Sequence, residues 1–172
     1  MEYIDEKRRA LLVAAAGGVS VLALPQMVSG YSMPAAAIRA LGESPLVYIS
    51  PLQSSGEESS CHGEVWFFVD GGDVVVGSQT DTWKVRAVNK GLDSARIWVA
   101  DYGPEWRSLG RYRKAPNFLA TASIDEDRAV YDSLMVAFGQ RYPDEWDAWE
   151  GKFRDQYASG QRVLIRYTPV GA

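Results

Sequence analysis

The sequence has little cysteine and histidine, with one of each, Cys61 and His62, in 172 residues. A single cysteine excludes an intrachain disulfide, and a single histidine leaves too few ligands for a structural zinc site. The chain also lacks an excess of positive charge. Its formal net charge is −4, whereas nucleic-acid-binding proteins usually need clustered cations to neutralise phosphates. We therefore expect no structural metal and no nucleic-acid partner.

Apolar residues are plentiful. The chain is 47% hydrophobic and 12% aromatic, which is enough to bury a core in a protein of this length. We find no internal repeat and no low-complexity segment. The sequence therefore predicts a single folded domain, at residues 41–172, preceded by a terminal extension.

The N-terminus has a basic stretch followed by an apolar one. Lys7, Arg8 and Arg9 precede residues 10–24, which are uncharged and mostly apolar. The segment resembles a bacterial twin-arginine export signal, and residues 28–30 or 35–37 offer small side chains for cleavage. We therefore expect residues 1–40 to be a signal and linker, and the protein to be exported to the periplasm.

Two other interpretations of this segment stay open. A membrane span needs about 20 apolar residues, and residues 10–24 fall short of this length, but no charge occurs between Ala10 and Ile38. Residues 10–25 are therefore also compatible with an apolar N-terminal helix that attaches the protein to a membrane, its basic end in the cytoplasm, or to a larger complex. An ordinary helix packed on the domain is the last alternative.

A β-hairpin is predicted near the middle of the chain. Residues 64–69 are mostly apolar and aromatic, and residues 74–76 are three valines. Between them, Asp70-Gly71-Gly72-Asp73 supplies residues that tolerate the positive φ of a tight hairpin turn. Further short strands are expected at residues 46–50, 95–101, 117–124 and 162–168.

Helices are predicted at three places. Residues 83–90 suit a short helix ended by Gly91, and residues 125–142 and 144–157 have apolar side chains at three-to-four spacing on either side of Pro143. Ser123 or Asp125 could cap the first of the long helices. Residues 102–114, with their glycines and a proline, are expected to form a surface loop. Short strands without a βαβ rhythm indicate a small antiparallel barrel with helical insertions.

The segment after the hairpin suits an anion. Ser78, Thr80 and Thr82 place three hydroxyl groups just before Lys84 and Arg86. Hydroxyl groups and cations together are suitable partners for a phosphate. By themselves, the two cations are equally compatible with a solvated helix surface.

These residues resemble a known family. Val65-Trp66-Phe67 on one strand, Val75-Val76-Gly77-Ser78 on the next, and the stretch from Thr82 through Trp83, Lys84 and Val85 to Arg86 are similar to the flavin-binding split-barrel proteins of the pyridoxamine 5'-phosphate oxidase-like superfamily. That group includes FMN enzymes, deazaflavin (F420) dependent reductases and haem-linked relatives. The resemblance covers residues 45–169 and implies a mainly β (α+β) fold, a six-stranded antiparallel split β-barrel.

The resemblance also implies roles for particular residues. Ser78, Thr82 and Lys84 would contact the phosphate of FMN or F420, with Trp83 inside the same motif and Arg86 as a supporting cation. Trp66 would lie near the flavin ring. Because the cofactor supplies the hydride chemistry, no catalytic triad is expected. In the family the pocket lies between two barrels, so a homodimer is implied.

One departure separates the chain from the FMN oxidases of the family. They carry an arginine-rich strand before the hairpin, whereas this chain has the sequence SSGEESSCHG at residues 54–63. Two hypotheses follow. The first is a flavin- or F420-dependent oxidoreductase. The second is a non-enzymatic split-barrel subunit or binding module, attached to a membrane or a larger complex through the N-terminal helix.

Overall fold

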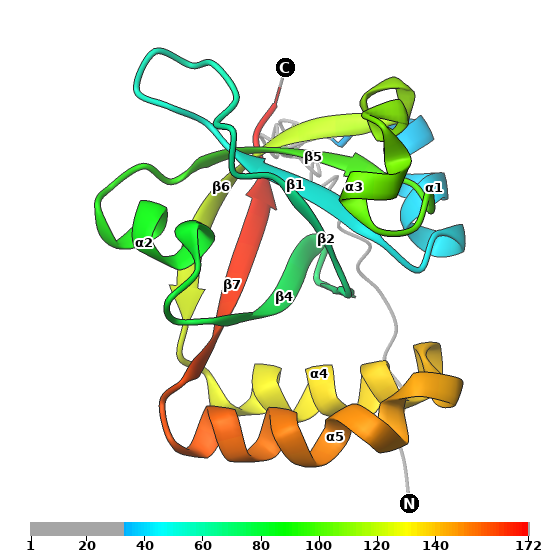
Figure 1. Ribbon diagram of the computed structural model, residues 1–172, viewed down its shortest axis with the longest axis vertical. Helices are drawn as coiled ribbons and strands as arrows, with labels where there is room; N and C mark the ends of the chain where they lie inside the picture. Colours follow the sequence, from blue (N-terminus) through cyan, green and yellow to red (C-terminus); the bar gives the residue numbers. More distant parts are fainter. Residues whose placement is uncertain (1–32, 172) are drawn as a thin grey trace, which may run out of the picture.

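The computed structural model describes residues 33–171 (Figure 1). Within these residues, seven strands and six helical segments follow one another. The strands are β1 (Val47–Pro51), β2 (Gly63–Val65), β3 (Phe68–Asp70), β4 (Asp73–Gln79), β5 (Ser94–Val99), β6 (Asn117–Asp125) and β7 (Arg162–Pro169). The helices are α1 (Ala35–Glu43), α2 (Trp83–Asn89), α3 (Glu105–Ser108), the 3-10 helix η1 (Arg111–Lys114), α4 (Arg128–Arg141) and α5 (Pro143–Ala158).

All seven strands belong to one antiparallel sheet in the order β2-β1-β5-β6-β7-β4-β3. β2 and β3 lie at opposite edges of this sheet, although only Trp66 and Phe67 separate them along the chain. The chain itself therefore joins the two edges, and the sheet curls into a half-barrel. The expected mainly antiparallel barrel with helices is confirmed. The predicted count of six strands is wrong, because the segment predicted as one strand at residues 64–69 breaks in two at Trp66-Phe67.

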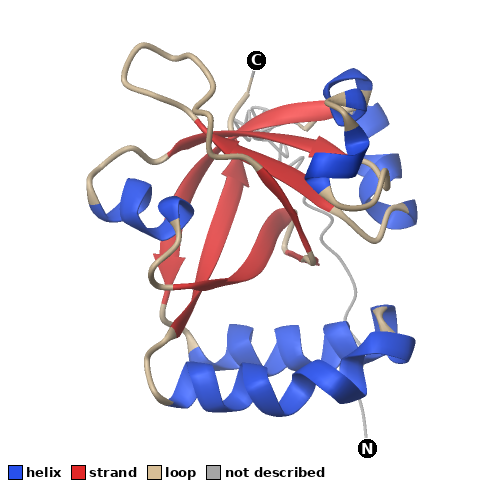
Figure 2. Ribbon diagram, viewed as in Figure 1, coloured by secondary structure: helices blue, strands red, loops and turns tan. Residues whose placement is uncertain are grey.

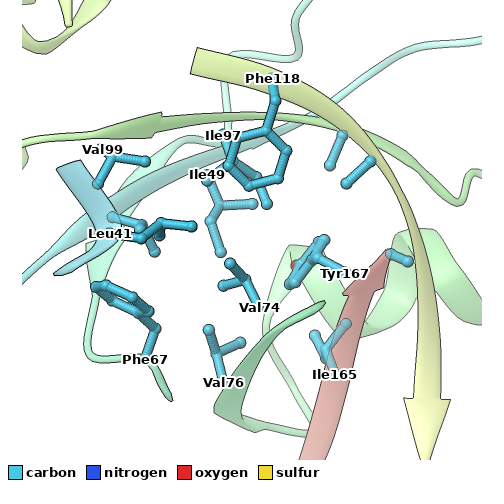
Figure 3. Packing of buried hydrophobic residues seen from close by; sticks show 14 of the residues in the cluster. Leu41, Ile49, Phe67, Val74, Val76, Ile97, Val99, Phe118, Ile165 and Tyr167 are labelled. Atoms are coloured by element: carbon cyan, nitrogen blue, oxygen red, sulfur yellow. The ribbon is translucent and has the colours of Figure 1, made fainter. Parts of the chain in front are cut away.

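The main core fills the interior of the curled sheet (Figure 3). Val74 and Val76 of β4 point inward, as alternate residues of a strand should. Phe67, at the break between β2 and β3, is fully buried in the same cluster. Ala37 and Leu41 of α1 pack against this core. The interior is apolar. The polar residues that could bind a ligand therefore lie on the outer face and at the turns.

The two longest helices cover the outer face of β3, β4 and β7 (Figure 2). Their buried side chains include Tyr131, Leu134, Phe138, Trp146 and Phe153. Two helix ends differ from the sequence prediction. The α4 cap is Asp127, whose Oδ1 accepts a hydrogen bond from the Ala129 nitrogen at 2.8 Å, rather than Ser123 or Asp125. α4 ends at Arg141, and Pro143, predicted to end that helix, is the first residue of α5.

The predicted surface loop at residues 102–114 is wrong. It contains α3 and η1, which pack on the outer face of β1 and β5 through Tyr112, stacked on Tyr48 at 4.4 Å. Pro104 caps α3, and Leu109 and Gly110 have positive φ angles of 51° and 72° between the two helices. The proline and glycine thus mark the ends of short helices. In the sequence they cannot be distinguished from the proline and glycine of a loop.

The expected apolar helix at residues 10–25 lies outside the described residues, as do residues 1–32 of the segment 1–40 predicted as a signal or membrane anchor and linker. Within residues 33–171, none of the helices is both long and apolar enough to cross a membrane. Residues 35–37, one of the two candidate cleavage positions, lie in α1, where Ala37 is fully buried.

Candidate functional site

The predicted anion-binding residues lie where β4 leads into α2. The hydroxyl groups of Ser78 and Thr82 are 2.9 Å apart, and Thr82 donates to the Gln79 carbonyl oxygen at 2.8 Å. Because the Thr82 proton is used in that bond, Ser78 donates to Thr82. Both hydroxyl protons are therefore engaged within the turn. To donate to a ligand, one of the two groups must rotate.

Lys84 follows Thr82 in the first turn of α2. Burial lowers the pKa of its ammonium group, and the nearby Glu64 and Cys61 oppose that shift. Among the described residues, the ammonium has no hydrogen bond or ion pair. The Glu64 carboxylate is itself fixed, because its Oε2 accepts from the backbone nitrogen of Glu105 at 2.8 Å. Lys84 is thus a partly desolvated cation, and Glu64 exerts the largest compensating charge effect on it.

Trp83 and Arg86 differ in their surroundings. The indole N–H of Trp83 is buried and lacks an acceptor among the described residues. A buried donor without a partner is unusual and costs about 1–3 kcal/mol. Arg86 is exposed, and its guanidinium donates to the carbonyl oxygen of Asp81 in the same turn. Trp83 therefore has an unused donor inside the motif, whereas Arg86 is occupied at the surface.

Trp66 lies in a different place, on the outer face. One face of its indole stacks on Tyr142 at 4.4 Å with an angle of 9° between the rings. It borders a pocket of about 370 Å³, here called the Trp66 pocket, lined by Leu46, Glu64, Val65, Trp66, Gly77, Phe138, Trp149, Phe153 and Arg162. The structure therefore brings Ser78 and Thr82 together, whereas Trp66 lines the outer pocket with Glu64, whose charge also acts on Lys84.

Sequence reasoning missed Glu64 and Arg162. Glu64 is the first residue of a segment predicted only as a strand, and Arg162 begins the last strand. Neither has a local pattern around it that indicates a site. Arg162 reaches the pocket because β7 pairs with β4, which places its guanidinium 2.9 Å from the carbonyl oxygen of Gly77.

The lone histidine is held in a small cluster beside α3. His62 Nε2 lies 3.0 Å from Glu105 Oε1, while its Nδ1 is buried without a partner among the described residues. The adjacent Cys61 is exposed. Within residues 33–171, no group of three or more histidine, cysteine or acidic side chains is arranged to hold a metal ion.

The curled antiparallel sheet, joined through Trp66-Phe67 and covered by helices on its outer face, defines a split-barrel fold. Solved structures of this fold are similar to the chain. HutZ, the heme storage protein from Vibrio cholerae, has a TM-score of 0.54 at 13% identity, over 78% of this chain and 88% of that chain. The conserved hypothetical protein Rv2991 from Mycobacterium tuberculosis has a TM-score of 0.53 at 15% identity, over 80% and 81%.

Campylobacter jejuni ChuZ is a third such structure, with a TM-score of 0.52 at 11% identity, over 78% of this chain and 54% of that chain. Identities this low establish a shared fold and no more. No protein-family model matches the chain, and no curated protein is similar to it in sequence. The split-barrel expectation is therefore confirmed at the level of fold.

Proposed function

We propose that the chain is a flavin- or deazaflavin-dependent oxidoreductase that holds the phosphate of FMN or F420 at the β4–α2 turn. The observation that supports this best is that two donors on consecutive residues, the Trp83 indole N–H and the Lys84 ammonium, have no partner among the described residues. A phosphate oxygen is an acceptor that suits both. The donor set of the motif thus fits the group.

The remaining residues of the turn have secondary roles. Ser78 or Thr82 would add a hydroxyl donor after rotating out of their mutual hydrogen bond. Arg86, being exposed, would contribute only a screened charge. Glu64 opposes binding, because a carboxylate close enough to act on the Lys84 ammonium also repels a phosphate held there.

The bound flavin or deazaflavin would supply hydride transfer. The chain's own task is to bind the phosphate, orient the ring and exclude water. Trp66, which the resemblance would put near the ring, is not proposed to contact it, because Trp66 lies on the outer face of the sheet whereas Ser78 is on the interior face of β4. A second copy of the chain is proposed to complete the pocket, as in the family that the motif resembles.

The test is the visible absorption spectrum of the purified protein, before and after addition of FMN, F420 or haem. We expect flavin or deazaflavin bands. Lys84→Met should weaken binding at least about tenfold, the usual effect of losing a charged hydrogen bond. Lys90→Met is the matched control, because Lys90 is exposed at the other end of α2 and should leave binding unchanged.

Other outcomes would contradict the proposal. Because HutZ is described as a heme storage protein, a Soret band without flavin bands would indicate haem as the cofactor of this chain. A protein that binds none of the three compounds would favour the non-enzymatic subunit or binding module instead.

We also propose that the protein is exported in folded form. The twin-arginine route carries folded proteins, which suits a domain that already holds its cofactor. Because Met33 and Ala37 are buried in the core, cleavage is expected at residues 28–30 and not at residues 35–37. Mass spectrometry of the mature protein from its own host checks this, and an intact N-terminus at Met1 or Glu2 would contradict cleavage.

A further inference from the structure

The Trp66 pocket contains a positive charge with no negative partner. Arg162 is 8% exposed, and no described carboxylate forms an ion pair with it. Burial lowers the pKa of its guanidinium, and no charged group contributes to that shift. Buried charges are usually paired, since desolvating an unpaired ion is costly. An uncompensated arginine in a pocket wall is therefore a suitable place for an anion.

The hydrogen bonds of Arg162 leave part of the guanidinium free. Its Nε and Nη2 donate to Gln156 Oε1 at 3.1 and 2.7 Å, and Nη1 donates to the carbonyl oxygen of Gly77 at 2.9 Å. A guanidinium has five N–H groups in a planar fork. Two N–H groups, one on each terminal nitrogen, thus have no acceptor among the described residues. Each of these N–H groups can donate a charge-assisted hydrogen bond to a carboxylate oxygen.

The walls of the pocket beside Arg162 are formed by aromatic side chains. Phe153 lies under the guanidinium, 3.8 Å from ring centre to Cζ, while Trp66, Phe138 and Trp149 line the rest. Gly77 lets Phe153 and Arg162 pack directly on the backbone of β4, since a Cβ there would lie 3.0 Å from Phe153 Cε1. Trp149 is 40% exposed at the pocket. Rings of this kind favour a flat aromatic ligand, which stacks on them or meets their edges.

We propose that the Trp66 pocket binds a flat aromatic carboxylate, with its carboxylate on Arg162 and its ring among Trp66, Phe138 and Trp149. Glu64 also lines the pocket, so a second anionic group on the ligand would be repelled. The proposal does not rest on the proposed function. Ser78 is on the interior face of β4, whereas Gly77 faces the pocket, so the phosphate turn and Arg162 are reached from opposite faces.

The experiment uses the full chain, freed of any cofactor, and 2-naphthoate as the probe. Binding is followed by calorimetry and by quenching of tryptophan fluorescence. We expect saturable binding of 2-naphthoate that exceeds the binding of neutral 2-naphthamide about tenfold or more, the usual contribution of a charge-assisted bond. The Arg162→Gln protein should lose the preference for 2-naphthoate over 2-naphthamide and bind the two compounds equally.

Two further variants separate a binding role from a structural one. Arg154→Gln removes an exposed charge from α5 and should keep full binding. Trp149→Ala, at the exposed rim, should weaken the binding of acid and amide alike. Equal 2-naphthamide affinity in the wild type and Arg162→Gln would show that the pocket is intact without the charge. The proposal is overturned if the wild type does not bind 2-naphthoate, or if Arg162→Gln keeps the preference for the acid.

Discussion

The hydroxyl group of Tyr142 lies 3.1 Å from the backbone nitrogen of Phe67, at the point where the chain passes from one edge of the sheet to the other. The hydroxyl accepts from Phe67 and donates to the carbonyl oxygen of Pro45 at 2.8 Å. Phe67 belongs to neither β2 nor β3. A side chain at the end of α4 therefore takes the place of a strand partner and holds the barrel closed.

Replacing Tyr142 with phenylalanine tests this role. Phe keeps the ring that stacks on Trp66 but leaves the Phe67 N–H and the Pro45 carbonyl without their partner. We expect a loss of about 1–3 kcal/mol in the free energy of unfolding, the usual effect of an unsatisfied buried group. Denaturant unfolding measures it. Tyr102→Phe, at an exposed tyrosine, is the control and should stay within about 0.5 kcal/mol.

The same hydroxyl predicts a dependence of stability on alkaline pH. Burial raises the pKa of Tyr142 from 10.0 to about 12, against smaller opposite effects of Phe67 and Arg141. A raised pKa contributes stability that is present below pH 10 and is lost as the pH rises through 12. The loss is roughly 2–3 kcal/mol across this window. Because other tyrosines also titrate there, the measurement is the difference in slope between the wild type and Tyr142→Phe, and equal slopes would contradict it.

Arg166 connects three aspartates from separate strands. Its guanidinium lies 2.6 Å from Asp70, 3.0 Å from Asp73 and 2.7 Å from Asp125. Arg166→Gln would leave three carboxylates close together, and we expect a loss of about 2–4 kcal/mol, less than for a fully buried ion pair because the arginine is 21% exposed. Added salt should reduce the loss by screening.

The control for Arg166 is Arg128→Gln. Arg128 pairs with Asp132 at 2.9 Å, but both side chains are more than half exposed. Such a pair contributes about 0.3–0.5 kcal/mol. Thermal and urea unfolding of both variants distinguish the two cases. An Arg166→Gln protein as stable as Arg128→Gln would show that the three-aspartate network contributes little.

The sequence predicted regular elements well and their interruptions poorly. Alternating apolar residues and turn signals identified the hairpin and the four other strands, because these signals are local. The break at Trp66-Phe67 could not be predicted in this way. Both residues are aromatic and suit a strand, and the partner that stabilises the break, Tyr142, comes 75 residues later than Phe67.

The candidate site shows the same limit. The spacing of Thr82 and Lys84 is visible in the sequence because both lie at one turn. Arg162 and Gly77 are 85 residues apart and meet only because β7 pairs with β4. Nor does the sequence indicate that the charge of Glu64 acts on Lys84, since this depends on where β2 lies in the sheet.

Lys84→Met distinguishes a functional lysine from a structural one. Because burial lowers the pKa of Lys84, its charged form is less favourable in the folded than in the unfolded chain. The variant should therefore be at least as stable as the wild type at neutral pH, while it loses cofactor binding. As the pH rises from the lowered pKa toward the ordinary value of 10.5, the unfolded chain binds more protons, so the wild type should gain stability relative to the variant. Unfolding curves of both proteins between neutral and alkaline pH, with Lys90→Met as the exposed control, measure this. A Lys84→Met protein that is clearly less stable at neutral pH would assign the lysine to the fold and leave the phosphate site without its main cation.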